Sequence, residues 1–389
     1  MSKQNFIQMK MIHKKSQIIF LLTGVLLFIF PFGKTINAQG CETDTPTEGI
    51  KIMGYIQPQF NTYFFGTDAS GNPIKNSTFF FKRARLGVMG AIPYDISYYV
   101  MVEMSPVAGG PQLLDAYITY APFGKKAMFS IGQFKSPYSL ELNTPCFALH
   151  TIRRSTVVNQ LASPFRDMGL MVLGKLGKND FLKYRIALLN GTGINHLDIN
   201  QNKDLAFSIH ISPLKWITVG GSYRGGLIGN KQLNGDQEKF SRYAVDFTLK
   251  RSNLLFQGEY LWGTDVGTVI SGGGCGGKKA AEIIMNPVEL MTLASHNKNG
   301  YWALAQYTTP WNLQAVVKYQ YYNSGNTTYT YLGQAQAFPE STMTLGFNYF
   351  INDWTRIQVN YLYNAEQKAN GIVNEYKNDA LLIQVQVKF

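Results

Sequence analysis

Short segments of alternating apolar and polar residues recur along the chain from about residue 50 to its last residue. In the last segment Gln384, Gln386 and Lys388 alternate with apolar residues that end at Phe389. The same period occurs in residues 242–250, 313–321 and 356–363. A period of two places successive side chains on opposite faces of a β-strand. The pattern therefore predicts an all-β protein whose strands each have one apolar and one polar face.

The connections between the segments distinguish a soluble sandwich from a membrane barrel. Tight links such as 92–95 and 309–310 follow even-numbered strands, and long polar links follow odd-numbered ones, among them 136–166, 225–239, 263–298 and 364–377. Such alternation is typical of outer-membrane barrels, whereas Greek-key sandwiches have no reason to show it. We therefore expect a transmembrane antiparallel β-barrel of about 16 strands with short periplasmic turns and long extracellular loops. The sixteen predicted strands begin near residues 52, 78, 96, 113, 127, 167, 182, 204, 216, 240, 254, 299, 311, 341, 354 and 379.

Composition excludes two other classes of protein. The 389 residues are 14% aromatic and 15% charged, and apolar residues are dispersed along the whole chain, which excludes a disordered protein. A helical membrane protein needs about 20 consecutive apolar residues for each span. The only long apolar run lies near the N-terminus, at residues 18–30.

That N-terminal run has the features of a secretory signal peptide. Four lysines precede it, and a small-residue site ends at Ala38. The alternative is an uncleaved anchor helix, but the run is short for a bilayer. We expect a signal peptide over residues 1–38 with cleavage after Ala38, a polar tail over 39–49 and one barrel over 50–389. The predicted destination is the outer membrane of a Gram-negative bacterium.

Positive charge is concentrated in the first half of the barrel. Removing residues 1–38 removes five lysines and lowers the net charge from +12 to +7. Residues 77–185 contain 13 basic and six acidic side chains, and the rest of the mature chain contains 18 of each. This asymmetry predicts electrostatic steering of an anion, without identifying the anion.

Five segments together resemble the phosphate-selective porin O and P family, in the form found in Bacteroidetes. They are FFKRARLGVMG at 80–90, LDAYITY at 114–120, IGQFKSPYSLE at 131–141, SPFRDMG at 163–169 and the final QVQVKF at 384–389. The resemblance covers essentially the whole mature chain. It implies a sixteen-stranded barrel, usually a homotrimer, whose lumen narrows where inward-folded loops meet a ladder of Arg and Lys.

The strand pattern also identifies candidate residues for an anion pathway. If Leu86 and Val88 face lipid, Arg83 and Arg85 face the pore, and a link as long as 136–166 can fold into the barrel. Arginine offers the bidentate geometry that phosphate accepts. The alternative is that these charges only solvate the lumen or bind lipopolysaccharide at the rim. The candidates are Arg83, Arg85, Lys135, Arg153, Arg154, Arg166, Lys183 and Arg185.

Other residues weaken the case for a dedicated phosphate channel. Acidic side chains at Glu103, Asp115, Asp246 and Glu259 are predicted to face the lumen, where they would cancel part of the positive field. We therefore expect an outer-membrane porin that passes small hydrophilic solutes by passive diffusion with an anion preference, which extends to phosphate in the family. A non-selective diffusion porin and a structural or adhesive barrel without transport are the alternatives.

Catalytic, cofactor and metal sites are not expected. His210 is predicted to face the lumen, but no nucleophile motif accompanies any histidine, so an enzyme is disfavoured. The expected partners are small anions such as phosphate, outer-membrane lipid and lipopolysaccharide, and two further copies of the chain in a homotrimer, with no nucleic acid. Two cysteine hypotheses remain open: acylation of Cys41 and a disulfide between Cys146 and Cys275.

Overall fold

The computed structural model describes residues 49–64, 77–198, 201–228, 238–266, 295–323, 329–331, 334–336, 340–366 and 379–389. The predicted signal peptide (1–38), Cys41 and Cys275 lie outside these ranges. Within the ranges, no helix is both long enough and apolar enough to cross a bilayer.

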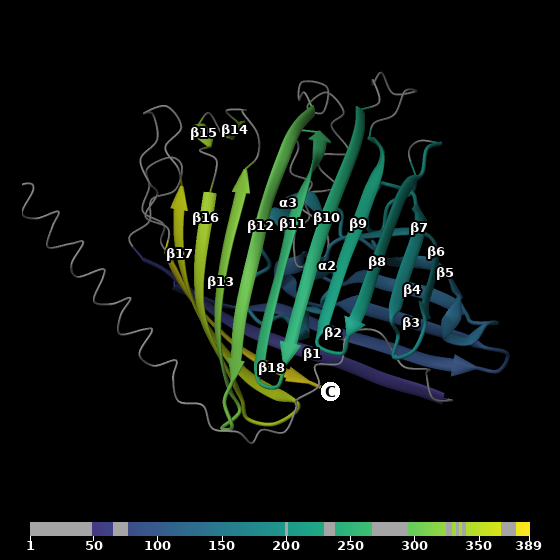
Figure 1. The fold of residues 1–389 in the computed structure, drawn as a ribbon. Helices are drawn as coiled ribbons and strands as arrows, with labels where there is room; N and C mark the ends of the chain where they lie inside the picture. Colours follow the sequence, from purple (N-terminus) through teal and green to yellow (C-terminus); the bar gives the residue numbers. More distant parts are fainter. Residues whose placement is uncertain are drawn as a thin grey trace, which may run out of the picture. The chain divides into compact units, whose positions relative to one another are not determined.

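Sixteen antiparallel strands close into one barrel, as the sequence predicted, and run side by side in Figure 1. Around the ring the order is β1-β18-β17-β16-β13, then β12 down to β2 in sequence order. The barrel strands are β1 (Gly49–Tyr63), β2 (Ser77–Ile92), β3 (Ile96–Glu103), β4 (Gln112–Tyr120), β5 (Met128–Lys135), β6 (Arg166–Leu176), β7 (Leu182–Leu189), β8 (Asp204–Leu214), β9 (Ile217–Ile228), β10 (Glu238–Arg251), β11 (Leu254–Val266), β12 (Ser295–Thr308), β13 (Leu313–Asn323), β16 (Glu340–Phe350), β17 (Thr355–Glu366) and β18 (Ala380–Lys388).

Two strands that the alternation did not predict form a separate two-stranded sheet between β13 and β16. They are β14 (Tyr329–Tyr331) and β15 (Gln334–Gln336). Each has three residues, too few for a period of two to be recognised in the sequence.

Short helical segments occur in the connections. The α-helices are α2 (Leu140–Asn143) and α3 (Thr156–Leu161), and the 3₁₀ segments are η2 (Pro106–Ala108), η3 (Gly124–Lys126) and η4 (Cys146–Ala148). The tight turns lie at one end of the barrel, here called the turn end. In the turn between β2 and β3, Tyr94 and Asp95 both have positive φ, the conformation that joins antiparallel strands without splaying them.

The two faces of the strands are distributed as a bilayer requires. Leu86, Ile118 and Leu170 point outward and are 48%, 53% and 54% exposed. Their neighbours Arg85 and Thr119 point inward and are buried. This arrangement is the reverse of a soluble protein and is typical of a transmembrane barrel. Aromatic side chains at strand ends, including Trp311 and Trp354, are exposed, as expected for interfacial girdles.

Candidate functional site

Residues 136–165, here called the inner loop, connect β5 to β6 and fold into the barrel. The backbone N–H of Ser136 donates to the carbonyl of Phe165 at 3.0 Å and closes the base of the loop. The side-chain amide of Asn143 donates to the carbonyls of Ser136, Tyr138 and Ser139 and fixes the first turn. Figure 1 shows α2 and α3 of this loop within the ring of strands.

The first part of the inner loop is attached to the wall at β9 and β11. Ser139 N–H donates to the hydroxyl of Ser222 at 3.0 Å. The carboxylate of Glu259 accepts from the N–H groups of Leu140 and Glu141 at 2.8 and 3.2 Å. It also accepts from the indole N–H of Trp302 at 3.0 Å. Glu259, which the sequence predicted to face the lumen, therefore holds backbone donors at the start of α2.

The middle of the inner loop is attached to the wall that lies opposite β5 and β6, the two strands that the loop connects. In the sixteen-strand ring β13 lies eight strands from β5, and β16 lies eight strands from β6. A row of inward amides on β16, β17 and β18 binds the loop backbone there: Asn348, Gln358 and Gln386 donate to the carbonyls of His150, Leu149 and Phe147, and Asn360 accepts from Ile152 N–H at 2.7 Å. The loop thus crosses the lumen, consistent with the expectation that it is long enough to fold inward.

Apolar packing fixes the last part of the inner loop. Val157, Val158 and Leu161 of α3 are fully buried in one cluster with the inward side chains of Leu261 and Trp302. Helix α3 contacts β11, β12 and β13. An apolar patch inside a polar lumen gives this short helix a specific place against the wall.

Several of the inward charged side chains form buried ion pairs. Arg166 donates two hydrogen bonds to the carboxylate of Asp115, both at 2.9 Å. Arg85 bonds Glu103 at 2.7 Å, Tyr55 Oη at 2.8 Å and Cys146 Sγ at 3.4 Å. The acids at 103 and 115 do face inward as predicted, but each is paired with one arginine. They compensate individual charges at close range.

Two further contacts hold the inner loop through charge. Lys318 on β13 pairs with Glu141, and the guanidinium of Arg154 donates to the carbonyls of Glu141, Leu142 and Thr144. Arg154 also donates to Cys146 Sγ at 3.3 Å. The Cys146 sulfur is buried among these groups, and because Cys275 lies outside the described residues, the disulfide between them stays a prediction.

The structure divides the eight predicted pathway residues into two groups of four. Arg83, Arg85, Arg154 and Arg166 are buried. Arg85, Arg154 and Arg166 make the contacts described above, and Arg83 donates to Gln57 Oε1 on β1 at 2.6 Å. Lys135, Arg153, Lys183 and Arg185 are partly exposed. Within this second group, Lys135 donates to Leu142 and Thr144 carbonyls, Arg153 donates to Tyr63 Oη, and Arg185 donates to Asn143 Oδ1.

Sequence reasoning missed a further set of inward cations. Arg224 pairs with Asp167 at 3.2 Å and with Asp204 at 2.9 Å, and Arg242 donates to the Ser163 carbonyl. Arg356 donates to Gln386 at 3.0 Å. The signal was present, because Arg242, Lys318 and Arg356 occupy polar positions of alternating segments. A count of charges over residues 77–185 does not include these three residues and does not show which face of a strand each charge occupies.

Solvent exposure of the inner wall is asymmetric. On β17 and β18 the inward side chains of Gln358, Asn360, Leu382 and Gln384 are at most 1% exposed. On β3, β4, β6 and β7 several inward side chains remain partly exposed, namely Ser97, Tyr99, Tyr117, Met171, Leu173, Lys175, Lys183 and Arg185. The inner loop therefore covers the wall from β11 round to β1 more completely than the wall from β3 to β7.

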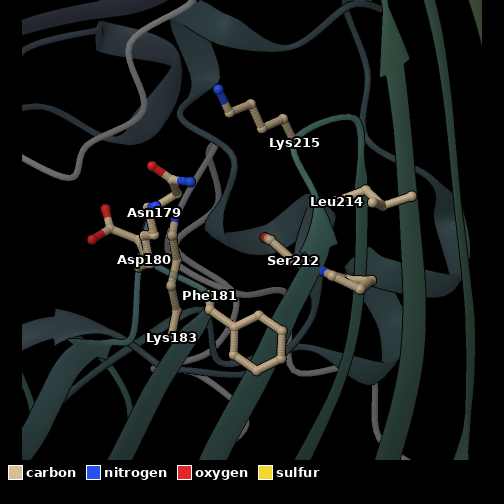
Figure 2. A pocket seen from close by; sticks show the side chains of 9 residues that line it. Asn179, Asp180, Phe181, Lys183, Ser212, Leu214 and Lys215 are labelled. Atoms are coloured by element: carbon tan, nitrogen blue, oxygen red, sulfur yellow. The ribbon is translucent and has the colours of Figure 1, made fainter.

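A cavity of about 420 Å³ lies at the turn end, between the β6–β7 and β8–β9 turns. Figure 2 shows Asn179, Asp180 and Phe181 on one side of it and Ser212 and Leu214 on the other. Its remaining lining residues are Lys178, Lys183, Pro213 and Lys215. Lys183 thus belongs both to the partly exposed inner wall and to the lining of this cavity, which contains three lysines and one aspartate.

One residue of the inner loop, His150, lies near several positive charges. The pKa of His150 is lowered to about 3, chiefly by burial and further by the positive charges of Arg356, Lys250 and Lys318. His150 is therefore neutral at neutral pH. His210, the histidine that the sequence predicted to face the lumen, does point inward, and its Nε2 lies 3.2 Å from an Asp246 oxygen.

A closed sixteen-stranded barrel with an apolar exterior, a polar interior and a loop folded across the lumen has the architecture of an outer-membrane porin. A family model described as phosphate-selective porin O and P matches residues 54–389. The chain belongs to this family, as the resemblance in the sequence implied.

Solved structures share the fold. The outer-membrane channel DcaP of Acinetobacter baumannii has a TM-score of 0.63 and 15% identity, with 89% of this chain and 100% of that chain covered. The anion-selective porin from Comamonas acidovorans has a TM-score of 0.61 and 10% identity, over 87% and 98% of the two chains. OmpT of Vibrio cholerae, in its trimer form, has a TM-score of 0.55 and 11% identity, over 89% and 100%. At these identities the likeness establishes the fold alone, and no curated protein sequence matches the chain.

Proposed function

We propose that this porin passes small hydrophilic solutes by passive diffusion and prefers anions. The observation that carries the proposal is the charge of the partly exposed inner wall. Lys175, Lys183 and Arg185 are the charged residues among the partly exposed inward positions of β3, β4, β6 and β7 that the structure describes. Positive charge in a narrow, water-filled passage raises the local concentration of anions and lowers that of cations.

Within the predicted pathway set, the two groups have different proposed roles. Lys135, Arg153, Lys183 and Arg185 are partly exposed and so supply the positive field that a solute meets. Arg83, Arg85, Arg154 and Arg166 position the inner loop and the wall through their hydrogen bonds. The barrel architecture and the family support a channel function rather than an enzymatic one.

Selectivity for phosphate over other anions is proposed to be weak. Bidentate binding of phosphate needs an accessible guanidinium fork. The forks of Arg166 and Arg85 are directed at Asp115 and Glu103. Of the four partly exposed side chains two are lysines, which attract phosphate only as point charges. The guanidinium groups of the other two, Arg153 and Arg185, each donate to a neighbouring side chain.

A phosphate titration in planar bilayers tests this assignment of roles. We expect an anion-preferring pore in which phosphate blocks chloride current only at high concentration, and in which Lys183→Ala/Arg185→Ala reduces anion preference more than Arg83→Ala/Arg85→Ala does. Strong block by low phosphate that is lost in the Arg83 and Arg85 variant would instead support a dedicated phosphate channel. Equal permeability to chloride and to the cation of the salt would leave a general diffusion porin. A barrel without conductance would leave a structural or adhesive protein.

We further propose that residues 1–38 are removed as a signal peptide during export to the outer membrane, leaving the 39–49 tail before a barrel over 50–389. In the outer membrane we propose that lipid contacts the exposed apolar band of the barrel, and that lipopolysaccharide contacts the end of the barrel opposite the turn end. A homotrimer is supported by the trimer form of the structurally similar OmpT. Mass analysis of the mature N-terminus and native electrophoresis of the unheated protein test these two points.

A further inference from the structure

An aromatic surface lies on the part of the inner wall that the inner loop leaves partly exposed. Tyr99 on β3 and Tyr117 on β4 are paired in the sheet register, and their rings stack with centroids 5.4 Å apart and an interplanar angle of 27°. Their sequence neighbours Val100 and Ile118 are exposed on the outside of the barrel. The two tyrosine rings therefore face the lumen.

The surrounding residues hold the Tyr117 ring in place. Phe134 on β5 is buried and packs edge-on against it, with centroids 6.3 Å apart at 87°. The strand partner of Tyr117 on β5 is Gly132, which has a φ of +135°. A Cβ at Gly132 would lie 2.9 Å from Tyr117 Cβ and 2.2 Å from a backbone oxygen. The close approach at Gly132 and the backing by Phe134 restrict the ring before any ligand arrives, which lowers the entropy cost of stacking on it.

Positive charge lies on the same part of the wall. Lys183 and Arg185 on β7 point inward and are partly exposed, and the acids of the neighbouring inward positions, Asp115, Asp167 and Asp204, are buried in pairs with arginines. By strand register Tyr117 is level with Leu189 on β7, so Arg185 and Lys183 lie three strands from Tyr117 and four and six residues along β7 from that level. A solute on this side of the lumen thus meets partly exposed tyrosine side chains within the positive field of these cations. Such a combination favours a flat ring that carries an acid group, since the ring stacks and the acid is attracted.

We propose that Tyr99 and Tyr117 form a binding face for the ring of small aromatic carboxylates, with Lys183 and Arg185 attracting the carboxylate. The proposal rests on the proposed pore function and adds a class of solute to it. Binding at this face is weak, because a pore must release what it binds.

The test measures block of chloride current by benzoate and by acetate, which carry the same charge and differ in the ring. We expect benzoate to block wild-type pores at about ten-fold lower concentration than acetate, a difference of about 1.4 kcal/mol that contacts between the benzoate ring and the tyrosine side chains supply. Tyr99→Leu/Tyr117→Leu should bring the two acids to within about two-fold of each other.

Two control variants separate ring stacking from other effects. Tyr99→Phe/Tyr117→Phe keeps the rings without their hydroxyl groups and should retain the preference for benzoate. Tyr98→Leu makes the same change on the outer side of β3 and should also retain it. Migration of unheated protein in SDS gels reports whether each variant forms a barrel, and the Phe variant keeps the proposal testable if the Leu variant does not.

The outcomes separate this inference from the function on which it rests. Equal block by benzoate and acetate in a conducting wild-type pore overturns the aromatic site and leaves the porin assignment intact. Loss of the preference for benzoate in the Phe variant would also overturn the aromatic site, because hydrogen bonding by the tyrosine hydroxyl groups, and not ring stacking, would then be responsible. A wild-type barrel that does not conduct overturns the proposed function itself.

Discussion

At the scale of single residues, inward charges in this barrel are largely compensated at short range. Asp115 and Arg166 are 9% and 3% exposed and share two hydrogen bonds. An ion pair so enclosed contributes little net stability by itself, but removing one partner leaves a buried charge without compensation. These residues thus determine how the wall and inner loop are held.

Asp115→Asn is expected to lower the free energy of unfolding by about 3–5 kcal/mol, because it leaves the Arg166 guanidinium buried opposite a neutral amide. Denaturant unfolding of the folded barrel measures this. The double variant Asp115→Asn/Arg166→Met should recover part of the loss. Lys125→Gln is the matched control, since its pair with Asp180 leaves Lys125 69% exposed and is worth about 0–1 kcal/mol. Equal losses in the Asp115 and Lys125 variants would contradict the structural role.

His150 gives a prediction about pH. Its folded-state pKa is about 3, below the ordinary value of 6.5, because burial and the nearby Arg356, Lys250 and Lys318 disfavour the charged form. The unfolded chain therefore takes up this proton first, so stability from neutral His150 is fully present above about pH 6.5 and is lost as pH falls toward 3. His150→Gln should lose less stability than wild type over that window in thermal unfolding. If thermal stability falls equally with pH in the two proteins, the predicted effect of His150 is wrong.

At the scale of elements, the strands were predictable and the attachment of the inner loop was not. Alternation located all sixteen barrel strands because each strand carries its own pattern, and the length of the 136–166 link predicted that it could enter the lumen. The contacts of Asn348 and Asn360 with the loop join residues about 200 positions apart. Register between distant strands decides such contacts, and no local pattern in the sequence records it.

Leu161→Ala tests the attachment of α3 to the wall. Leu161 is fully buried in the cluster with Leu261 and Trp302, so truncation should cost about 2–5 kcal/mol of stability and increase current noise as the loop loosens. Unfolding and single-channel recordings measure the two effects. Leu86→Ala, on the lipid-facing side of β2, should leave the current trace unchanged. A quiet channel in the Leu161 variant would show that α3 does not limit movement of the loop.

At the scale of the whole molecule, the sequence predicted an excess of positive charge but not which charges a solute would meet. Arg85 and Lys183 are equivalent by alternation, since both occupy inward positions. In the structure Arg85 is covered by Tyr55, Glu103 and Cys146, whereas Lys183 remains partly exposed beside the cavity at the turn end. The path of the inner loop makes this difference, so side-chain burial rather than strand position distinguishes the two groups of cations.

The reversal potential of the wild-type pore in a KCl gradient tests the central claim most directly. We expect a potential of the sign set by chloride, which moves toward zero in Lys183→Gln/Arg185→Gln while conductance persists. A wild-type potential near zero, or of the sign set by potassium, would contradict an anion-preferring porin.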